Sequence, residues 1–417
     1  MALGNFARCV FTTLSLYSKI DVQNFCCEVP VKISVGNPVE GDDFFDREQE
    51  QLRAWRKLEG SHLLMLAPRR IGKTSLILRL CATAAKHGRY AVHCSFAKCE
   101  SESDCIRELF NALATQQSIT QRSKALFARI KSVKVGELGI EWHAATAEKW
   151  REAGEELGKA LSEGSDDWLV CIDELPVFII NLLQQGDEGR RKARAFLYWL
   201  RDLRQTHYRR VKWLLAGSIG LDTLAARLGL SDTINDLEPF PLDAFSADSA
   251  RRFLGELARS YRIELAPALC DAIVRRVGWP VPYYLQLMFE HIREECLDRG
   301  KAPDEAMVEQ VFEKLLGMGY RNHFDYWRQR LDEELGQPDA AYAALLLTAI
   351  CRSDSGKSRD TLAQMLGQRI GDPGERDKML NYLLEVLVSD GYLVERQGRY
   401  AYRLEWLRIY WQRRFAT

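Results

Sequence analysis

The sequence predicts an α/β fold in which a parallel sheet is followed by a helical lid and a C-terminal winged helix. Three stretches predict it. Residues 64–80, "LMLAPRRIGKTSLILRL", pass from one apolar run through a short turn into a second apolar run. Residues 168–176, "WLVCIDELP", form an apolar run that ends in two acids. Residues 338–417 combine helical periods with two short alternating segments.

Composition limits the class of protein. The 417 residues suffice for two or three domains, and 47% hydrophobic with 28% charged residues is ordinary globular composition. Lys plus Arg and Asp plus Glu both number 58, so no net charge attracts nucleic acid or anionic lipid. No apolar run approaches the roughly 18 residues that a spanning helix needs, so we expect no membrane partner. The eleven cysteines show no Cys-x-x-Cys pairing, which indicates free thiols and a cytoplasmic protein.

Changes in pattern divide the chain into four predicted parts. Residues 1–35 are an N-terminal extension of uncertain order, without a clean signal-peptide pattern. Residues 36–245 are expected to form the α/β core. A helical period throughout residues 246–330 predicts the lid, and residues 338–417 have the element order of a winged helix.

The turn that follows the first apolar run matches most of the phosphate-binding P-loop, G-x-x-x-x-G-K-[ST]. Gly72, Lys73 and Thr74 supply its second half, and Ala67 replaces its first glycine. Alanine still reaches ordinary backbone conformations, so we expect the loop to bind phosphate. The strand before it and the helix after it, which stops at Gly88, distinguish it from a chance Gly-Lys-Thr. The expected nucleotide contacts are Ala67, Pro68, Arg69, Arg70, Ile71, Gly72, Lys73, Thr74 and Ser75.

The acids that end the second apolar run complete this site. Asp173 is expected to hold Mg²⁺ through water, with Thr74 on the metal directly, and Glu174 to polarise the attacking water. One hundred residues separate Lys73 from Asp173, which leaves room for the intervening units of a parallel sheet. The predicted cofactors are therefore ATP and Mg²⁺.

A third predicted strand, in "RRVKWLLAGSIGL", ends at Ser218, at the sheet edge where ligands of such folds lie. Ser218 either senses the γ-phosphate or the attacking water, or is a plain turn residue. The helix before this strand presents Arg201 and Arg204 on one side. Each could reach a phosphate in this chain or in a neighbouring subunit, although helix arginines are more commonly solvated. The expected catalytic residues are Lys73, Glu174 and Ser218.

Six segments, in order, resemble the archaeal-type ATPase family in the STAND branch of AAA+-related P-loop ATPases. They are "FFDREQE", "APRRIGKTSL", "CIDELPVF", "WLRDLRQ", "LAGSIGL" and "GWPVPYYLQ". The resemblance covers about residues 36–320, with Asp46 and Ala67 in place of two glycines of the family.

The resemblance also implies how the base is held. Phe45, Arg47 and Glu48 correspond to the signature segment that lies over the adenine. Pro280, in the Gly-x-Pro segment, corresponds to the proline that touches the base from the lid. Proline offers a rigid helix start with no backbone donor to satisfy, but the same segment could be only a helix–helix corner.

The C-terminal part leaves two interpretations open. Residues 338–417 contain twelve Lys or Arg and ten Asp or Glu, far from the basic face of a DNA-binding domain. We therefore favour a packing and protein-interaction module. DNA binding through Arg396, Arg399 and Arg403 of the wing is the alternative. A hairpin predicted within "VKVGELGIEW", residues 133–142, is either a docking element or the wall of a loop.

Together these features predict a slowly hydrolysing regulatory switch. ATP with Mg²⁺ would draw the lid and the core together, and hydrolysis would release them, so that the bound nucleotide decides which surface meets a protein effector. A nucleotide-dependent oligomer is compatible with this prediction. The alternatives are a DNA-binding initiator or transposition-type AAA+ ATPase, and a nucleotide-binding scaffold that scarcely hydrolyses.

Overall fold

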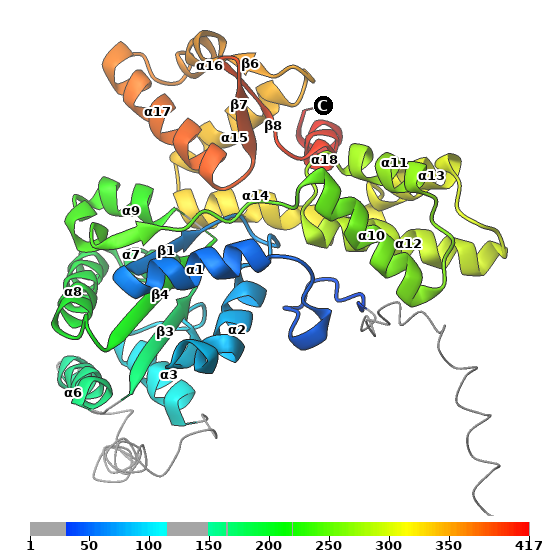
Figure 1. The fold of residues 1–417 in the computed structure, drawn as a ribbon. Coiled ribbons are helices and arrows are strands. Elements are labelled where there is room, and N and C mark those ends of the chain that lie inside the picture. Colours follow the sequence, from blue (N-terminus) through cyan, green and yellow to red (C-terminus); the bar gives the residue numbers. More distant parts are fainter. Residues whose placement is uncertain (1–30, 115–148, 164–165, 219, 417) are drawn as a thin grey trace, which may run out of the picture.

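The protein is described from a computed structural model that covers residues 31–114, 149–163, 166–218 and 220–416 (Figure 1). The predicted hairpin at residues 133–142, and residues 1–30 of the predicted extension, lie outside the described residues. Among the described residues, no helix has both the length and the apolar character required to cross a membrane.

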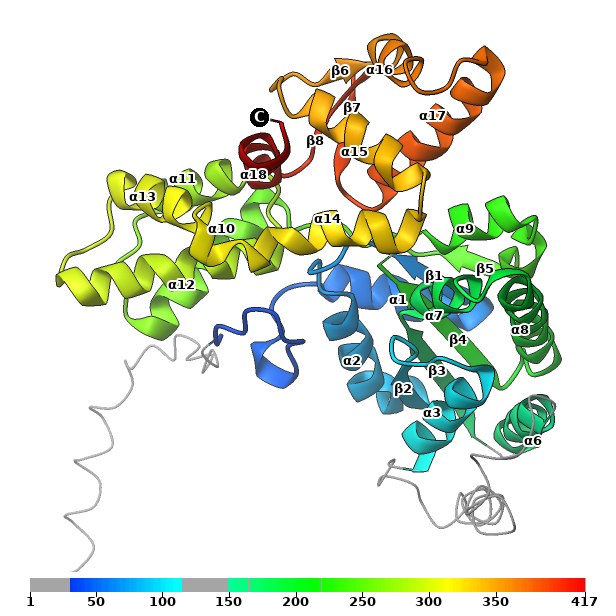
Figure 2. The same ribbon diagram turned by 180° about the vertical axis from the view of Figure 1, so that it is seen from behind.

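Five parallel strands form the central sheet in the order β2-β3-β4-β1-β5 (Figures 1 and 2). They are β1 (His62–Leu66), β2 (Arg89–Ser95), β3 (Asp167–Asp173), β4 (Val211–Gly217) and β5 (Leu237–Pro239). The three central strands are almost wholly buried, as the strands of a sheet covered on both faces must be. Because β4 separates β1 from β3, its carboxyl end lies between the P-loop and the predicted acids.

Helices cover both faces of this sheet. Those that pack around it are α1 (Glu48–Gly60), α2 (Lys73–Thr83), α3 (Glu102–Ala114), α6 (Lys149–Glu163), α7 (Leu175–Leu183), α8 (Gly186–Thr206) and α9 (Leu221–Leu228). Apolar residues of α1 and α2 pack on one face, and those of α3, α6, α7, α8 and α9 form a second core on the other. The short 3₁₀ helices are η1 (Gly41–Asp43), η2 (Ala84–His87), η4 (Ser231–Ile234) and η5 (Met318–Tyr320).

The lid is a helical bundle beside the carboxyl end of the sheet. Its helices are α10 (Ala247–Tyr261), α11 (Pro267–Val277), α12 (Pro282–Arg299) and α13 (Glu305–Leu315). Side chains cap two of them: Ser246 Oγ accepts from the Ser249 amide, and Asp304 accepts from the Met307 amide. The long helix α14 (Asn322–Leu335) then runs back from the lid to the core (Figures 1 and 2).

The C-terminal part has the element order of a winged helix. Its elements are α15 (Asp339–Ile350), β6 (Lys357–Ser358), α16 (Arg359–Leu366), α17 (Pro373–Ser389), β7 (Leu393–Arg396), β8 (Arg399–Tyr402) and α18 (Glu405–Phe415). The strands form an antiparallel sheet in the order β6-β8-β7. Gln397 and Gly398 both have positive φ in the β7–β8 turn, as a tight hairpin requires. One hydrophobic core runs without interruption from the α2 face of the sheet through the lid into this part.

Candidate nucleotide-binding site

The P-loop joins β1 to α2, and the side chain of its lysine is hydrogen-bonded to carbonyl groups of the loop itself. Gly72 precedes α2 with a φ of 103°, and Arg70 has a φ of 68°, whereas Ala67 is not a left-handed position and accommodates its methyl group. Lys73 is buried, and its Nζ donates to the carbonyls of Ala67 at 2.8 Å and Pro68 at 3.3 Å. Burial lowers the pKa of Lys73, while nearby carboxylates act in the opposite direction. The ammonium could therefore bind a phosphate if it exchanged these two carbonyl groups for phosphate oxygens.

Two oxygen atoms face each other where a cation is expected. Thr74 begins α2 and Asp173 ends β3, and Thr74 Oγ1 donates to Asp173 Oδ2 at 2.6 Å. The other carboxylate oxygen accepts from the Glu174 amide at 2.9 Å. Magnesium prefers oxygen ligands and is commonly bound by one or two protein groups together with substrate phosphates, so this donor set fits it. The described residues contain no cluster of three or more His, Cys, Asp or Glu that could hold a metal.

Two of the three predicted catalytic residues, Glu174 and Ser218, are hydrogen-bonded to each other. Glu174 has a left-handed φ of 55° at the start of α7, and its Oε2 accepts from the Ser218 amide at 3.2 Å and the Ser218 hydroxyl at 2.9 Å. Ser218 is fully buried and follows β4, between the strands that end in the P-loop and in Asp173. Arg69 Nε donates to the same hydroxyl at 3.2 Å. This serine therefore connects the P-loop with the predicted water-polarising acid.

The second P-loop arginine points to the lid instead. The guanidinium of Arg70 lies over the ring of Tyr283 at 3.9 Å and over that of Tyr326 at 4.1 Å, and it donates to the His323 carbonyl at 3.0 Å. Tyr283 belongs to α12, and the other two partners belong to α14. We call these contacts of Arg70 with α12 and α14 the Arg70 clamp. Because its partners lie more than two hundred residues away in the sequence, only the tertiary structure could reveal it.

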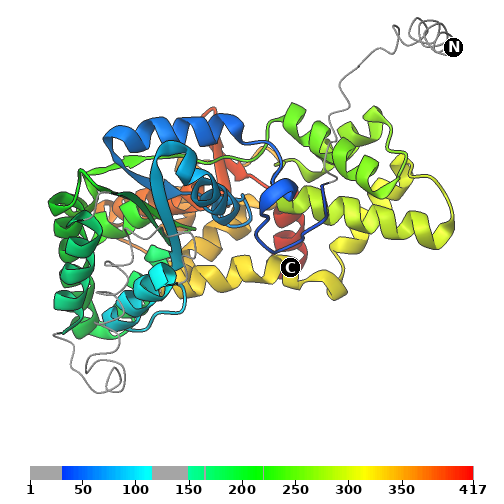
Figure 3. The same ribbon diagram turned by 60° about the horizontal axis from the view of Figure 1, so that its bottom comes forward.

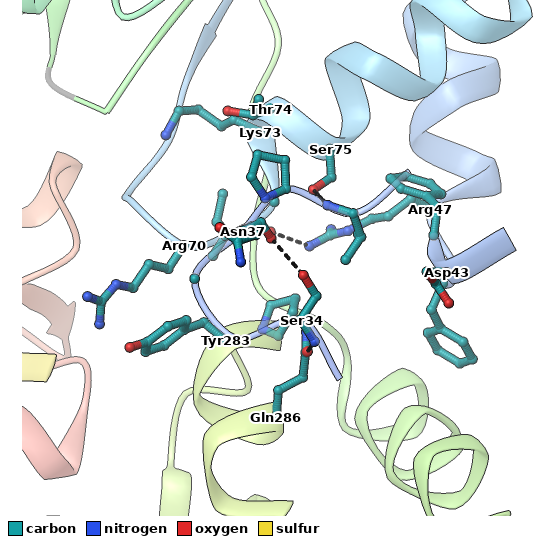
Figure 4. A pocket seen from close by; sticks show the side chains of 18 of the residues that line it. Ser34, Asn37, Asp43, Arg47, Arg70, Lys73, Thr74, Ser75, Tyr283 and Gln286 are labelled. Carbon is teal, nitrogen blue, oxygen red and sulfur yellow. Dashed lines mark hydrogen bonds between the residues drawn. The ribbon is translucent and has the colours of Figure 1, made fainter. Parts of the chain in front are cut away.

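A cavity of about 260 Å³ extends from the P-loop toward the lid (Figure 4). Its wall includes the loop from Arg69 to Ser75, the acid Glu174, and residues of the segment 31–47. That segment lies between the core and the lid helices (Figures 1 and 3). The remaining lining residues, which come from beyond β5 and from α12, are Phe245, Phe253, Pro282, Tyr283 and Gln286.

The aromatic part of this cavity includes one of the residues predicted to lie near adenine. Phe45 packs against Phe253 at 5.1 Å and Phe245 at 6.0 Å between ring centroids, which gives an apolar surface for a base. Arg47 also lines the cavity, and its Nη2 donates to the Asp243 carbonyl at 2.6 Å. Glu48, in contrast, is an exposed residue at the start of α1.

The Gly-x-Pro segment reaches the cavity two residues later than the resemblance implies. Pro282 and Tyr283 line it, and Pro280 is not among the lining residues. The Pro280 carbonyl accepts from the Phe245 amide at 3.1 Å, so this proline fixes an aromatic residue of the wall. A second proline in the same five-residue stretch was visible in the sequence, but the resemblance pointed to the first.

The two helix arginines considered for phosphate contact are engaged elsewhere in this chain. Arg204 is 1% exposed and binds Asp236 through two hydrogen bonds of 2.9 and 2.7 Å. Arg201 forms an ion pair with Asp232 at 3.2 Å. Both pairs fasten α8 to the segment before β5, so they serve packing within the core.

The C-terminal part touches the phosphate end of the site. Gly391, in the turn between α17 and β7, has a φ of 83°, and a Cβ there would lie 2.7 Å from Pro68 of the P-loop. Arg330 of α14 is 1% exposed and donates through Nη2 to the Ser218 carbonyl at 2.8 Å, and Glu334 accepts from its Nε at 2.5 Å. The P-loop, the Ser218 turn and the α17–β7 turn therefore form one packed junction.

Comparisons with known proteins support the fold. No protein-family model and no curated protein matches the chain. Among solved structures, the Walker-type ATPase Paby2304 of Pyrococcus abyssi is similar with a TM-score of 0.58 and 19% identity, over 91% of this chain and 99% of that chain. The ORC2 protein of Aeropyrum pernix, in ADPNP–ADP complexes, is similar with a TM-score of 0.52 and 12% identity, over 89% of this chain and 95% of that chain. The predicted P-loop α/β fold with a helical lid is confirmed. The C-terminal part has the element order that the sequence predicts for a winged helix.

Proposed function

We propose that this protein is an ATP-binding, slowly hydrolysing switch of the STAND type that controls a protein partner. The observation that carries the proposal is the shared cavity, whose phosphate end is built by the P-loop and whose other end is built partly by the lid residues Pro282, Tyr283 and Gln286. A nucleotide that fills it contacts both bodies at once. Its binding must then favour the arrangement in which core and lid are close.

The residues of the chain suggest how ATP would be held. Lys73 would exchange the carbonyls of Ala67 and Pro68 for the β- and γ-phosphates. Thr74 and Asp173 would hold Mg²⁺, which supplies charge neutralisation at the phosphates. Phe45 and its aromatic neighbours offer a surface for the base. The ORC2 protein named above was solved with nucleotides of the adenine class, and we infer the same class of ligand here.

Slow turnover follows from the bonding of Glu174. Its Oε2 already accepts two hydrogen bonds from Ser218, so these bonds must break before this oxygen can accept a proton from water. Ser218 is in turn held by Arg69 and, through its carbonyl, by Arg330. We infer that hydrolysis requires this junction to rearrange. A scaffold that binds nucleotide without hydrolysing it would keep the junction closed throughout.

The contacts of the winged helix favour a protein-interaction role over DNA binding. Arg399 donates to the carbonyls of Ser355 and Gly356, and Arg403 pairs with Asp243 of the core at 2.9 Å. These two wing arginines are therefore committed within the chain. The helix α17 is also docked on the core, where its Tyr382 accepts from Arg227 of α9 at 2.9 Å. DNA binding through this face would require the docked arrangement to open.

Two measurements on the full chain separate these functions. Titration calorimetry should detect ATP and ADP binding, and a phosphate-release assay should detect slow turnover at saturating ATP. Fluorescence anisotropy with duplex DNA, repeated from low to high salt, should show no binding beyond weak salt-sensitive association. Absence of nucleotide binding would overturn the proposal, tight DNA binding would establish the AAA+ initiator alternative, and binding without phosphate release would establish the scaffold.

A further inference from the structure

Two thiols lie side by side between the P-loop helix and the strand that carries the metal-binding acid. Cys81 is on α2, Cys171 is on β3, and their sulfur atoms are 3.9 Å apart. All cysteines in the described part of the chain are free, and Cys171 is buried whereas Cys81 is partly exposed. Of the two residues, Cys81 is therefore the one nearer to solvent, and the Cys171 sulfur lies behind it.

The two cysteines lie in the same α2–β3 interface as the expected magnesium ligands. Cys81 follows Thr74 by seven residues, or about two helical turns, so both lie on the same side of α2. Cys171 precedes Asp173 by two residues, so both point to the same face of β3. The thiol contact and the hydrogen bond from Thr74 to Asp173 are thus two contacts along one helix–strand packing line.

We propose that Cys81 and Cys171 form a reversible disulfide that weakens binding of the magnesium–nucleotide complex. A hydroperoxide is the oxidant. The Cys81 sulfur attacks the peroxide oxygen and becomes a sulfenic acid, with water or alcohol as the leaving group. The Cys171 sulfur then attacks the sulfenic sulfur, the S–S bond forms, and the displaced hydroxide leaves as water with the second thiol proton. Two thiols lose two electrons and the peroxide gains them.

The physical consequence follows from the direction of the movement. A disulfide holds its sulfurs at about 2.05 Å, so the 3.9 Å pair must close by about 2 Å, which draws α2 toward β3. Magnesium demands near-octahedral geometry, so its binding depends on the relative position of Thr74 Oγ1 and Asp173 Oδ2, which now lie 2.6 Å apart. The disulfide therefore disturbs the spacing of the two groups on which metal binding depends. Cytosolic disulfides are usually transient and redox-sensing, so this chemistry suits the compartment expected from the sequence.

The neighbouring thiol of Cys94 does not offer an equivalent pairing. Its sulfur contacts the Cys171 carbonyl at 3.8 Å rather than the Cys171 sulfur. The two side chains also belong to different cores, since Cys171 packs with α2 and Cys94 packs on the opposite face of the sheet. The strand backbone lies between them, which leaves Cys81 as the partner.

The first test is chemical and does not depend on nucleotide binding. The reduced full-length protein is treated with hydrogen peroxide, blocked with N-ethylmaleimide and mapped by peptide mass spectrometry without reduction. We expect a Cys81–Cys171 peptide that dithiothreitol removes. Cys81→Ser, with Cys81→Ala as a second variant, should not form it, and Cys296→Ser is the matched control that should. Absence of this peptide, or pairing of Cys171 with another cysteine, overturns the proposal.

The second test rests on the proposed function. In calorimetry, oxidation should weaken the affinity of the parent for ATP with Mg²⁺ by about tenfold, and for ATP with EDTA by less than about twofold. Oxidised Cys81→Ser should bind as the reduced parent does. Equal affinities before and after disulfide formation overturn the proposed effect. Failure of the reduced parent to bind ATP would instead overturn the proposed function and leave the disulfide map standing.

Discussion

The two ends of the candidate site are built in different ways. At the phosphate end, Lys73, Thr74 and Asp173 come from a short loop and one strand end, and buried contacts within the core fix them. At the base end, the wall is assembled from Phe45, from residues beyond β5 and from α12 of the lid. The first end is built from neighbouring segments of the core, and the second from both core and lid. Under the proposed function, the first end binds the phosphates and the second couples the nucleotide to the lid.

The largest expected effect breaks the phosphate end. Lys73→Ala removes the buried ammonium that would meet the β- and γ-phosphates, so ATP affinity should fall by about a hundredfold or more in calorimetry. The exposed Lys86, in the short helix that follows α2, supplies the matched control Lys86→Ala, which should bind as the parent does. Unchanged affinity in a folded Lys73→Ala protein would move the site away from the P-loop.

The second prediction separates chemistry from binding at the same end. Glu174→Gln keeps an oxygen that can accept from Ser218, but the amide cannot take a proton from water. Phosphate release should fall by about a hundredfold or more, with ATP affinity changed by less than about threefold. Phosphate release equal to that of the parent would remove Glu174 from the reaction.

The third prediction concerns the clamp that joins the two ends. Arg70→Ala removes two cation–π contacts, each worth about 0.5–2 kcal/mol, and a hydrogen bond to α14. We expect faster hydrogen exchange in α12 without nucleotide and about tenfold weaker ATP binding, while exposed Arg56→Ala changes neither. A double-mutant cycle with Tyr326→Leu should give a coupling of about 1 kcal/mol. If the effects of the two substitutions on ATP affinity are additive, the contact between Arg70 and Tyr326 does not couple the lid to nucleotide binding.

The fourth prediction is a pH dependence at the junction behind the phosphate end. Asp390 is buried in the α17–β7 turn, where burial and the nearby Glu334 raise its pKa to about 8 from its ordinary value of 3.8. The folded state then holds this proton more tightly than the unfolded state, so stability is fully present below about pH 4 and is lost as the pH rises toward 8. In Asp390→Asn this titration is absent.

The melting temperature of Asp390→Asn, relative to that of the parent, should therefore rise by a few degrees between pH 6 and pH 8. The exposed Asp354→Asn is the control, since its side chain is 87% exposed. A difference that stays constant across this pH range would mean that Asp390 is ionised throughout it.

The residues of the candidate phosphate end could be named from the sequence because they belong to short motifs. The strand–loop–helix pattern located Lys73 and Thr74, and the apolar run before Asp173 located the acids. The same pattern predicted the fold class. Ser218 was correctly placed at the sheet edge, because the carboxyl ends of parallel strands meet there.

The residues that line the base end could not be predicted from the sequence with the same accuracy. Its wall depends on how the lid packs, and the resemblance selected Pro280 where the cavity is lined by Pro282. The contacts of Arg70 with Tyr283 and Tyr326, and of Gly391 with the P-loop, join residues that no short pattern connects. Such contacts depend on tertiary packing rather than on local preference, which is why they became visible only in the structure.

The smallest expected effect compares variants of these two prolines, which lie two residues apart. Pro282→Ala should weaken ATP-dependent closing of the lid by a factor of a few, because Pro282 lines the cavity and its ring fixes the start of α12. Pro280→Ala should leave ATP affinity unchanged, because Pro280 contacts the cavity wall through the Phe245 amide and does not line the cavity itself. The reverse order of effects would return the base contact to Pro280, as the resemblance implies.

The most direct test of the central claim, that nucleotide bridges core and lid, is hydrogen exchange of α2 and α12 with and without ATP. The phosphate end alone predicts protection of α2. A bridging nucleotide also predicts slower exchange in the first turns of α12, and this second protection should disappear in Lys73→Ala because the ligand no longer binds. Protection of α2 with exchange in α12 unchanged by saturating ATP would contradict the account.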